Sequence, residues 1–216
     1  MSICSLKKNK YKIRHLPFRR VYSSGFSLVI SMVMLVVILL LSVSLAYLSL
    51  QSERAARNNR DRQVAMTAAE AALRDAESDI DSQASIGRSL IFDASSNLFF
   101  EEECARGDSN TYQGLCLPAG PGKAAVWLTV DIASDGADAA SVQFGRFTGQ
   151  KMAIGRALFP SKLPRYLIEA VPDVEAGQRA DDHMKYVFRI TAIGFGSDSK
   201  TQVVLQSFYR KAAKSI

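Results

Sequence analysis

The sequence predicts an α+β protein in which one long N-terminal helix packs on an antiparallel β-sheet. A charge-free apolar run continues, without any glycine or proline, into an Ala-rich amphipathic segment. Segments with strand-like character follow only in the C-terminal half of the chain. A helix that precedes a group of strands is typical of α+β domains, because βαβ units would intersperse the two.

The basic character of the chain is confined to its N-terminal tail. The 216 residues carry a net charge of +6. Seven basic residues and no acidic ones lie in residues 1–25: Lys7, Lys8, Lys10, Lys12, Arg14, Arg19 and Arg20. The rest of the chain has 20 basic and 21 acidic residues, which is a net charge of −1. This distribution argues against nucleic-acid binding through overall charge, so a nucleic-acid partner is not expected.

The segment from Phe26 to Leu50 predicts a retained transmembrane helix. Its 25 residues would form a helix of about 37 Å, longer than the hydrocarbon core of about 30 Å. The run is too long for the apolar region of a secretory signal peptide, and no clean cleavage site follows it. The basic residues before it favour a cytoplasmic N-terminus and place the later residues outside the inner membrane.

Two details of this region bear on its packing and orientation. The span contains four small serines, which either permit close approach of another helix or simply face lipid. They are Ser31, Ser42, Ser44 and Ser49. Four arginines follow the span: Arg54, Arg57, Arg60 and Arg62. They weaken the difference in basic charge between the two sides of the span without reversing it. We expect these arginines to be solvated or to face lipid headgroups.

The helix is predicted to continue beyond the membrane to about Asp79, giving one helix over residues 26–79. The second part is rich in Ala, Leu, Glu and Arg. One small apolar face comprises Val64, Ala68, Ala71 or Ala72, Asp75 or Ala76, and Ile80. This face favours packing on a globular domain; a coiled coil is the alternative, although a strict 3.5-residue period is not kept. Acidic residues near Asp79 oppose the helix dipole and predict fraying between Asp79 and Gly87.

Five segments in the C-terminal half predict strands. They are Ala124–Val130, Val142–Phe147, Tyr166–Val171, Lys185–Ile193 and Gln202–Tyr209. Alternate residues of the fourth segment, from Tyr186 to Ala192, share one apolar face. Glycine and serine residues between the last two segments predict a hairpin loop, and residues 82–123 are expected to form an irregular connection.

The three cysteines are Cys4, Cys104 and Cys116. Cys4 lies on the cytoplasmic side of the proposed span, whereas the other two would lie in an oxidising periplasm. Cys104 and Cys116 are 12 positions apart across a glycine-containing loop. This spacing favours a disulfide, worth about 3 kcal/mol in the chain-entropy model. A zinc site is the alternative, but the usual paired spacing of zinc ligands is missing.

The region around Gly25 resembles a processing signal. A basic leader, then Gly25 and Phe26, then a long apolar run is similar to the class III signal of type IV prepilins. The resemblance implies that a prepilin peptidase cuts the Gly25–Phe26 bond and methylates the new N-terminus on Phe26. Residues 1–25 would be a cleaved cytoplasmic leader, residues 26–50 a transmembrane and assembly helix, and residues 51–216 a periplasmic α+β domain.

Four further segments resemble the PilX group of type IV pilus minor pilins. They are NRDRQVAMTAAEAALRDAE (Asn59–Glu77), PRYLIEAV (Pro164–Val171), RITAIGFG (Arg189–Gly196) and VVLQSFYRK (Val203–Lys211). The resemblance implies a pilin fold and a minor pilin that helps to initiate pilus assembly, at or near the tip, in a system that drives twitching motility. The protein would lie in the bacterial inner membrane before assembly and on the pilus at the cell surface afterwards.

The same resemblance implies a set of partners. Prepilin peptidase would act on the leader, and other minor pilins and the major pilin would contact the N-terminal helix. Inner-membrane lipid would surround that helix before assembly, and a large pilus-tip adhesin is a further candidate.

Two features depart from the family pattern. Most pilins have Glu at the fifth position of the mature chain, where this sequence has Ile30. That Glu is thought to meet the N-terminal amine of a neighbouring subunit, so its absence puts ordinary shaft incorporation in doubt. It is compatible with a tip subunit, as in the Glu-less minor pseudopilin of type II secretion. The 25-residue leader is also long for type IVa pilins, which leaves open a start downstream of Met1.

Other function classes have weaker support. No nucleophile motif, phosphate-binding glycine loop or metal-ligand pair is evident, so neither an enzyme nor a cofactor is expected. The acidic groups Glu101–Glu103 and Asp131, Asp135 and Asp138 lack EF-hand spacing and are expected to be solvated.

A pilus-borne adhesion, aggregation or DNA-binding subunit is the main alternative, and a plain signal-anchored periplasmic protein is another. DNA binding would need a basic stripe. Its best candidates are Arg146, Lys151, Arg156, Lys162 and Arg165. These residues are spread along the chain, and most are expected to be solvated charges.

Overall fold

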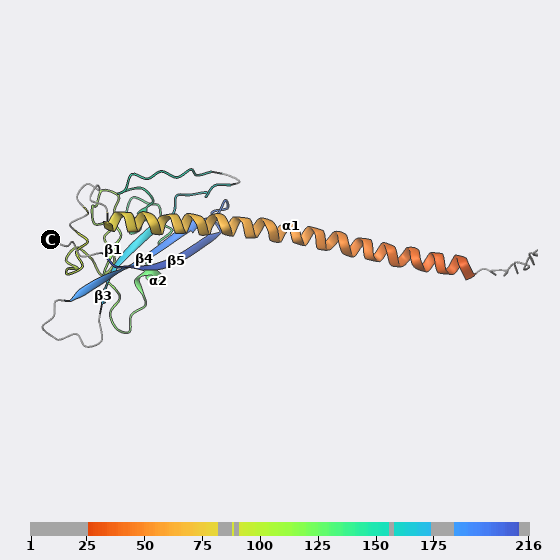
Figure 1. Cartoon of the computed structure of the whole chain (residues 1–216), viewed down its shortest axis with the longest axis horizontal. Helices are drawn as coiled ribbons and strands as arrows, with labels where there is room; N and C mark the ends of the chain where they lie inside the picture. Colours follow the sequence, from red (N-terminus) through yellow and green to blue (C-terminus); the bar gives the residue numbers. More distant parts are fainter. Residues whose placement is uncertain (1–25, 82–87, 89–90, 156–157, 174–183, 212–216) are drawn as a thin grey trace, which may run out of the picture. The chain divides into compact units, whose positions relative to one another are not determined.

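The computed structural model describes residues 26–81, 88, 91–155, 158–173 and 184–211. The chain divides into two compact units, residues 1–52 and residues 53–216. The first unit contributes a helical segment, and the second contributes the remainder of that helix together with a β-sheet (Figure 1).

Helix α1 runs from Phe26 to Asp81 over 56 residues. No glycine or proline interrupts it, and its Ala- and Leu-rich composition supports the helical backbone throughout. The helix predicted over residues 26–79 is therefore confirmed and ends slightly later. The expected fraying falls mainly on residues 82–87, which lie outside the described residues.

The sheet has five strands: β1 (Leu115–Cys116), β2 (Val142–Gln143), β3 (Arg165–Asp173), β4 (Lys185–Phe195) and β5 (Gln202–Tyr209). Their order is β1-β3-β4-β5, and β2 also pairs with β3. The three long strands are antiparallel, as predicted. The predicted α+β fold with an antiparallel sheet is confirmed, and the sheet is mixed at one edge, where the short strand β1 pairs with β3 in parallel. A two-residue strand inside the irregular connection carries too little periodicity to be predicted from sequence.

The prediction of a strand at Ala124–Val130 is wrong. The structure has a short helix there, α2 (Val126–Thr129), in which the amide of Val130 donates to the carbonyl of Val126 at 2.9 Å. Val126 is buried, whereas Leu128 is 66% exposed. A short apolar run is ambiguous between a strand and a helical turn, and here no neighbouring strand pairs with it among the described residues.

Two apolar clusters cover the two faces of the sheet. The cluster beneath α1 joins Ala72, Ala76 and Ile80 of the helix to Tyr166, Ile168, Phe188, Ile190 and Ala192 of the strands. The cluster on the other face joins Leu167, Ile193 and Phe195 to Cys104, Cys116, Val126 and Ile132. This alternation confirms the apolar face predicted for the fourth strand segment.

The contact between α1 and β4 is set by small residues on both sides. A side chain at Gly194 would overlap the backbone of Ala65 and Ala69, and one at Gly196 would overlap the Asp61 carboxylate. The Ala-rich helix face and the two glycines of the IGFG sequence therefore match each other, because neither leaves room for a larger residue.

Candidate functional site

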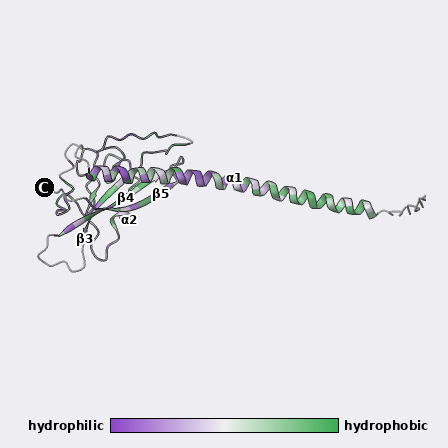
Figure 2. Cartoon of the chain, viewed as in Figure 1, coloured by the Kyte–Doolittle hydropathy of each residue, from purple (hydrophilic) through white to green (hydrophobic). Residues whose placement is uncertain are grey.

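The most prominent candidate site is the apolar segment of α1, residues 26–50. Its side chains are all exposed, and Phe26 and Leu28 are about 70% exposed. By length and composition the helix could cross a membrane, with a mean hydropathy of 3.0 in its most apolar window. Figure 2 shows this segment as the longest hydrophobic stretch of α1. Such a segment needs a partner outside the chain, either lipid or other helices.

Three serines of the apolar segment need no hydrogen bond from that partner. The hydroxyl groups of Ser31, Ser42 and Ser44 donate to the carbonyl groups of Leu28, Ile38 and Leu40 at 2.8–2.9 Å. Each hydroxyl is thus satisfied within its own helix. The small side chains can therefore face lipid or a closely packed helix without an unpaired donor.

The first turn of α1 contains no acidic residue. Ile30 lies at the position where the family resemblance would place Glu, and its side chain is 47% exposed. The start of the helix therefore offers a neighbour an apolar surface rather than a carboxylate. Gly25, the residue before the predicted cleavage point, lies outside the described residues.

A charged stretch, residues 53–62, follows the apolar segment. Its four arginines, here called the arginine collar, are Arg54, Arg57, Arg60 and Arg62, and all are exposed. Arg57 pairs with Glu53 at 2.6 Å on the helix surface. Figure 2 shows this stretch as a polar band on α1.

The other acidic residue of this stretch, Asp61, is turned toward the domain. It accepts backbone N–H groups of Ser197 at 2.6 Å and Asp198 at 3.2 Å, in the loop between β4 and β5. Burial alone would raise the pKa of Asp61, but hydrogen bonds from Thr201, Asp198 and Ser197 hold it below its usual value. Asp61 therefore holds the loop between β4 and β5 against α1.

A buried polar cluster fastens the other end of α1. Asp75 accepts the Gly145 amide at 2.7 Å and the Thr148 hydroxyl. Asp79 accepts the Tyr166 hydroxyl at 3.0 Å and contacts the Arg88 guanidinium at 3.1 Å. The sequence interpretation of these acids as unfavourable helix-end charges is incomplete, because tertiary partners compensate both.

Arg88 is the centre of this cluster. Its side chain is fully buried, donates to the carbonyls of Thr111 at 2.7 Å and Gln113 at 3.0 Å, and stacks on Phe147 with 3.7 Å to the ring centroid. Burial raises the pKa of Asp79 to about 6, although the Arg88 charge and the Tyr166 hydroxyl oppose this rise. Burial also lowers the pKa of Arg88. The cluster holds the helix, the connecting region and β3 in one arrangement.

The predicted disulfide between Cys104 and Cys116 is confirmed. Both half-cystines are buried in the second apolar cluster, and Cys116 belongs to β1. The bond therefore joins the connecting region to the edge of the sheet. Cys4 lies outside the described residues.

Of the basic residues considered for DNA binding, the four that the structure describes do not form a stripe. Arg165 is buried and donates to the Ser141 hydroxyl at 2.7 Å, Arg146 pairs with Asp108 at 3.6 Å, and Lys162 pairs with Asp135 at 3.0 Å. Lys151 is exposed, and Arg156 lies outside the described residues. Several of these side chains therefore hold loops of the domain in place, which leaves little free positive charge on this segment.

The acidic groups do not converge on a metal site. Within the part of the chain that the structure describes, no group of three or more His, Cys, Asp or Glu side chains could hold an ion. Residues 101–103 and Asp131, Asp135 and Asp138 are exposed, as expected. Asp131 accepts the Ala133 amide at 3.0 Å, which closes a local turn.

The domain also has an open cleft of about 550 Å³ beside the disulfide. Its lining includes Glu102, Glu103, Lys123, Pro172, Met184 and Tyr186. These side chains combine exposed charges with a partly apolar wall.

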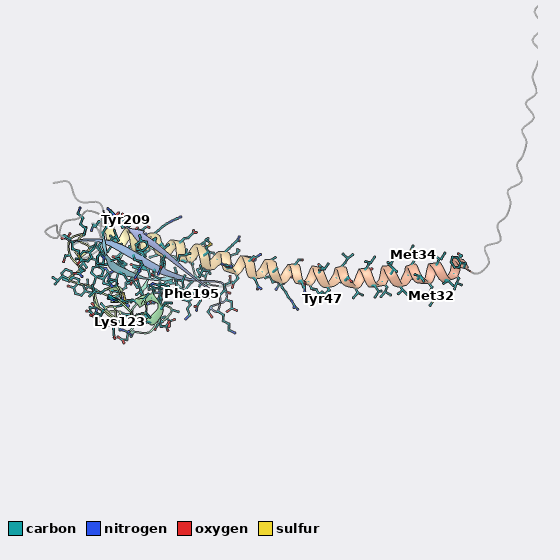
Figure 3. All side chains as sticks on the ribbon, turned by 90° about the horizontal axis from the view of Figure 1, so that it is seen from below. Met32, Met34, Tyr47, Lys123, Phe195 and Tyr209 are labelled. Carbon is teal, nitrogen blue, oxygen red and sulfur yellow. A yellow bond between two sulfur atoms is a disulfide. The ribbon has the colours of Figure 1, made fainter. Side chains whose placement is uncertain are left out.

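Figure 3 shows all described side chains, including Phe195 and Tyr209 on the domain and Met32, Met34 and Tyr47 on the apolar segment. Tyr209, at the end of β5, donates to the Asp81 carboxylate at the end of α1. That hydrogen bond raises the pKa of Tyr209 to about 12. Four acids of α1 thus reach the rest of the domain: Asp61 the loop between β4 and β5, Asp75 the turn that contains Gly145, Asp79 strand β3, and Asp81 strand β5.

Two family models match the chain. The model described as PilX N-terminal matches residues 24–74, which include Gly25, the apolar segment and most of the Ala-rich face. The model described as type IV pilus assembly protein PilX C-term matches residues 112–211, which include all five strands. No curated protein and no solved structure matches the chain.

Proposed function

Since the chain belongs to the PilX family of type IV pilus assembly proteins, we propose that it is a minor pilin that helps to initiate assembly and lies at or near the pilus tip. The observation that carries this proposal is the exposed apolar segment, continuous with a helix that is fastened to an α+β domain. Such a segment can be stored in the membrane and later packed among other apolar helices, so its burial persists through assembly.

The proposed topology follows from charge and hydropathy. The basic leader would remain in the cytoplasm, the apolar segment would span the inner membrane, and the domain would lie in the periplasm. Prepilin peptidase would cut between Gly25 and Phe26 and methylate Phe26. The mature chain would then reach the cell surface with the pilus, where it would contact other minor pilins, the major pilin and a candidate tip adhesin.

Ile30 supports a position at or near the tip. An apolar residue here cannot offer the charge that the family's Glu is thought to present to a neighbouring amine. A subunit at the tip has no further subunit above it in the filament, so it can dispense with that contact. Ile30→Glu tests this reasoning: it should increase the amount of this chain relative to major pilin in sheared pili. An unchanged ratio would contradict the role of Ile30, while leaving family membership intact.

Processing is tested by Gly25→Ala. The variant should keep the leader, migrate more slowly on a gel and reduce piliation, because the peptidase requires the glycine in the proposed signal. Mass spectrometry of sheared wild-type pili should find N-methyl-Phe26. Normal piliation with unchanged mobility of the variant, or the absence of the processed chain from pili, would overturn the proposal.

The alternatives receive less support. DNA binding is disfavoured because Arg146, Lys162 and Arg165 are engaged within the domain. A non-enzymatic role is part of the proposal, since pilus assembly requires packing surfaces rather than chemistry. A plain signal-anchored protein would be indicated if deletion of the gene left pilus number and twitching unchanged.

A further inference from the structure

We propose that the outer edge of β5 pairs with β5 of a second copy of this chain, as two antiparallel strands related by a twofold axis. The strand is the last in the sheet order and, among the described residues, pairs with β4 alone (Figure 1). The inference goes beyond the minor-pilin proposal, because it rests on the sheet and on residues 53–81 of α1, and requires neither a pilus nor a membrane.

The outer edge of β5 has open backbone groups. Alternate residues of an edge strand direct their N–H and C=O groups away from the neighbouring strand. Among the described residues, no backbone hydrogen bond reaches Gln202–Tyr209 from any segment other than β4. A groove of about 540 Å³, lined by Asn58, Arg62 and residues 200–204, leaves the start of this edge open beside α1. The edge is therefore accessible to another strand.

The sequence of β5 lacks the features that keep an edge strand from pairing. Natural edge strands carry lysines or other charges, prolines or bulges. The eight residues of β5, QVVLQSFY, contain no charged residue and no proline. Their register with β4 is continuous from Gln202 to Tyr209, without a bulge. An uncharged and regular edge favours pairing with another strand.

The face of β5 turned away from α1 also lacks a cover. Val204 and Phe208 lie opposite Ile193 and Arg189 of β4, and residues that lie opposite each other share a face of the sheet. Ile193 is buried in the second apolar cluster, whereas Val204 is 49% exposed and Phe208 is 66% exposed. The cover that α2 and the connecting region provide therefore ends at β4, and it leaves two apolar side chains of β5 in solvent.

The exposed residues are arranged so that β5 matches itself. In an antiparallel pair centred on Gln206, each Val204 lies opposite Phe208 of the second copy. An aromatic side chain opposite a β-branched one is a favourable cross-strand pair, and the symmetry forms this pair twice. A charge near the centre would face its own copy, and β5 carries none. This symmetry selects a second copy as the occupant, because a strand of a different protein would not require it.

The proposed pair fixes the relative direction of the two chains. Its twofold axis is normal to the sheet, so it reverses every direction within the plane of the sheet. Residues 53–81 of α1 pack across one face of the sheet, and they therefore run in opposite directions in the two copies. Subunits whose helices lie parallel to each other cannot pair in this way. The edge of β5 is thus suited to join chains that meet from opposite directions, through a small and reversible contact.

The first test uses the full-length chain in detergent micelles, with Cys4→Ser so that the native cysteines present no free thiol. Gln206→Cys places a thiol at the proposed axis, where the two Cα atoms would lie about 4.5–5.5 Å apart. A short bismaleimide should therefore link two chains. Gln202→Cys is the matched control, because Gln202 is also exposed on this face of β5, but its two copies would lie about 27 Å apart. The control should give no covalent dimer.

The second test adds Val204→Lys to the Gln206→Cys chain. The lysine removes one member of a cross-strand pair that occurs twice, so the yield of linked dimer should fall about tenfold. Leu128→Lys is the control and should leave the yield unchanged. Leu128 is 66% exposed on α2, whose Val126 and Thr129 line a cleft with residues of β3 rather than β5. Far-UV circular dichroism checks that each variant remains folded.

Three results would overturn the proposal: equal linking at positions 202 and 206, no linking at position 206, or a dimer yield that ignores Val204→Lys. A link from position 206 to a different pilus subunit, with none between copies, would overturn it as well, because the edge would then belong to another partner. None of these results bears on cleavage between Gly25 and Phe26, so the minor-pilin proposal stands or falls separately.

Discussion

The two parts of α1 share one backbone conformation and differ in where their partners are. In residues 26–52 the described side chains are all exposed and none is charged. In residues 53–81 one face is buried by small residues, and acids at positions 61, 75, 79 and 81 bond to loops and strands of the domain. Both parts are therefore helical, but only the second part has side chains that pack on and bond to particular residues of the domain.

The comparison shows how one helix can serve two environments. The second part is fastened by partners within the chain, so its position on the sheet is determined by this sequence. The first part has no such partner among the described residues and is suited to any apolar surroundings, whether lipid or other helices. Four experiments separate these roles.

The largest effect is expected from Asp79→Ala. This change leaves the Arg88 guanidinium buried without its carboxylate, which should cost the domain about 3–5 kcal/mol of unfolding free energy. Denaturant unfolding followed by near-UV circular dichroism measures the loss. Asp138→Ala, at an exposed position, is the control and should stay within about 0.5 kcal/mol of wild type. A similar cost for both variants would refute the structural role of the buried cluster.

Val37→Arg and Met66→Arg test the two parts directly, because both residues are 45% exposed on α1. Val37→Arg should oppose membrane insertion by about 3 kcal/mol, since it places a charge near the centre of the apolar segment. Met66→Arg should be tolerated, because its surroundings are water. Alkaline extraction of membranes reports retention of each variant. Equal retention of the two variants would show that the first part is not a membrane span.

Gly194→Ala tests the close contact between β4 and α1. The new Cβ atom would overlap the backbone of Ala65 and Ala69, so we expect a loss of about 2 kcal/mol in unfolding free energy. Gly120→Ala is the control, because nothing lies within 4 Å of that position. Thermal unfolding of the two variants compares them. An unchanged melting temperature for Gly194→Ala would show that helix and sheet can separate without cost.

The smallest effect is a pH dependence that resides in the second part of α1. Burial raises the pKa of Asp79 from 3.8 to about 6, so between these values the folded chain holds a proton that the unfolded chain has released. This group therefore makes the domain less stable as the pH rises from 3.8 to 6. Asp79→Asn should flatten the dependence in that window. An NMR titration that places the Asp79 midpoint near 3.8 in the folded chain would contradict this expectation.

The strands show what local pattern predicts. The segment Gln202–Tyr209 is predicted with the bounds of β5, because its alternation and the glycines before it are both local signals. Ala124–Val130 has a similar apolar content but forms α2, because no strand pairs with it among the described residues. The parallel pairing of β1 cannot be predicted for a related reason. A strand of two residues shows no alternation of apolar and polar side chains, so only its pairing with β3 identifies it as a strand.

The features of the candidate site likewise include some that a local sequence pattern predicts and others that it does not. The apolar segment and the Cys104–Cys116 pair can be found from composition and spacing, whereas Gly25–Phe26 is proposed as a processing point only because of the family resemblance. The buried cluster cannot, because Asp79 and Tyr166 are 87 positions apart and each looks like an ordinary polar residue in its own segment. Arg165 similarly looks like a surface cation in the sequence, although the loop that contains Ser141 covers it.

By itself, the sequence determined the long helix, its charge-free first part and the antiparallel long strands. These features depend on hydropathy, period and the absence of helix breakers, which act between near neighbours in the chain. Only the tertiary structure decided which acids are buried, where glycines face alanines, and which loops lie beside the arginine collar. These depend on contacts between distant segments, whose free energy appears only when the segments meet.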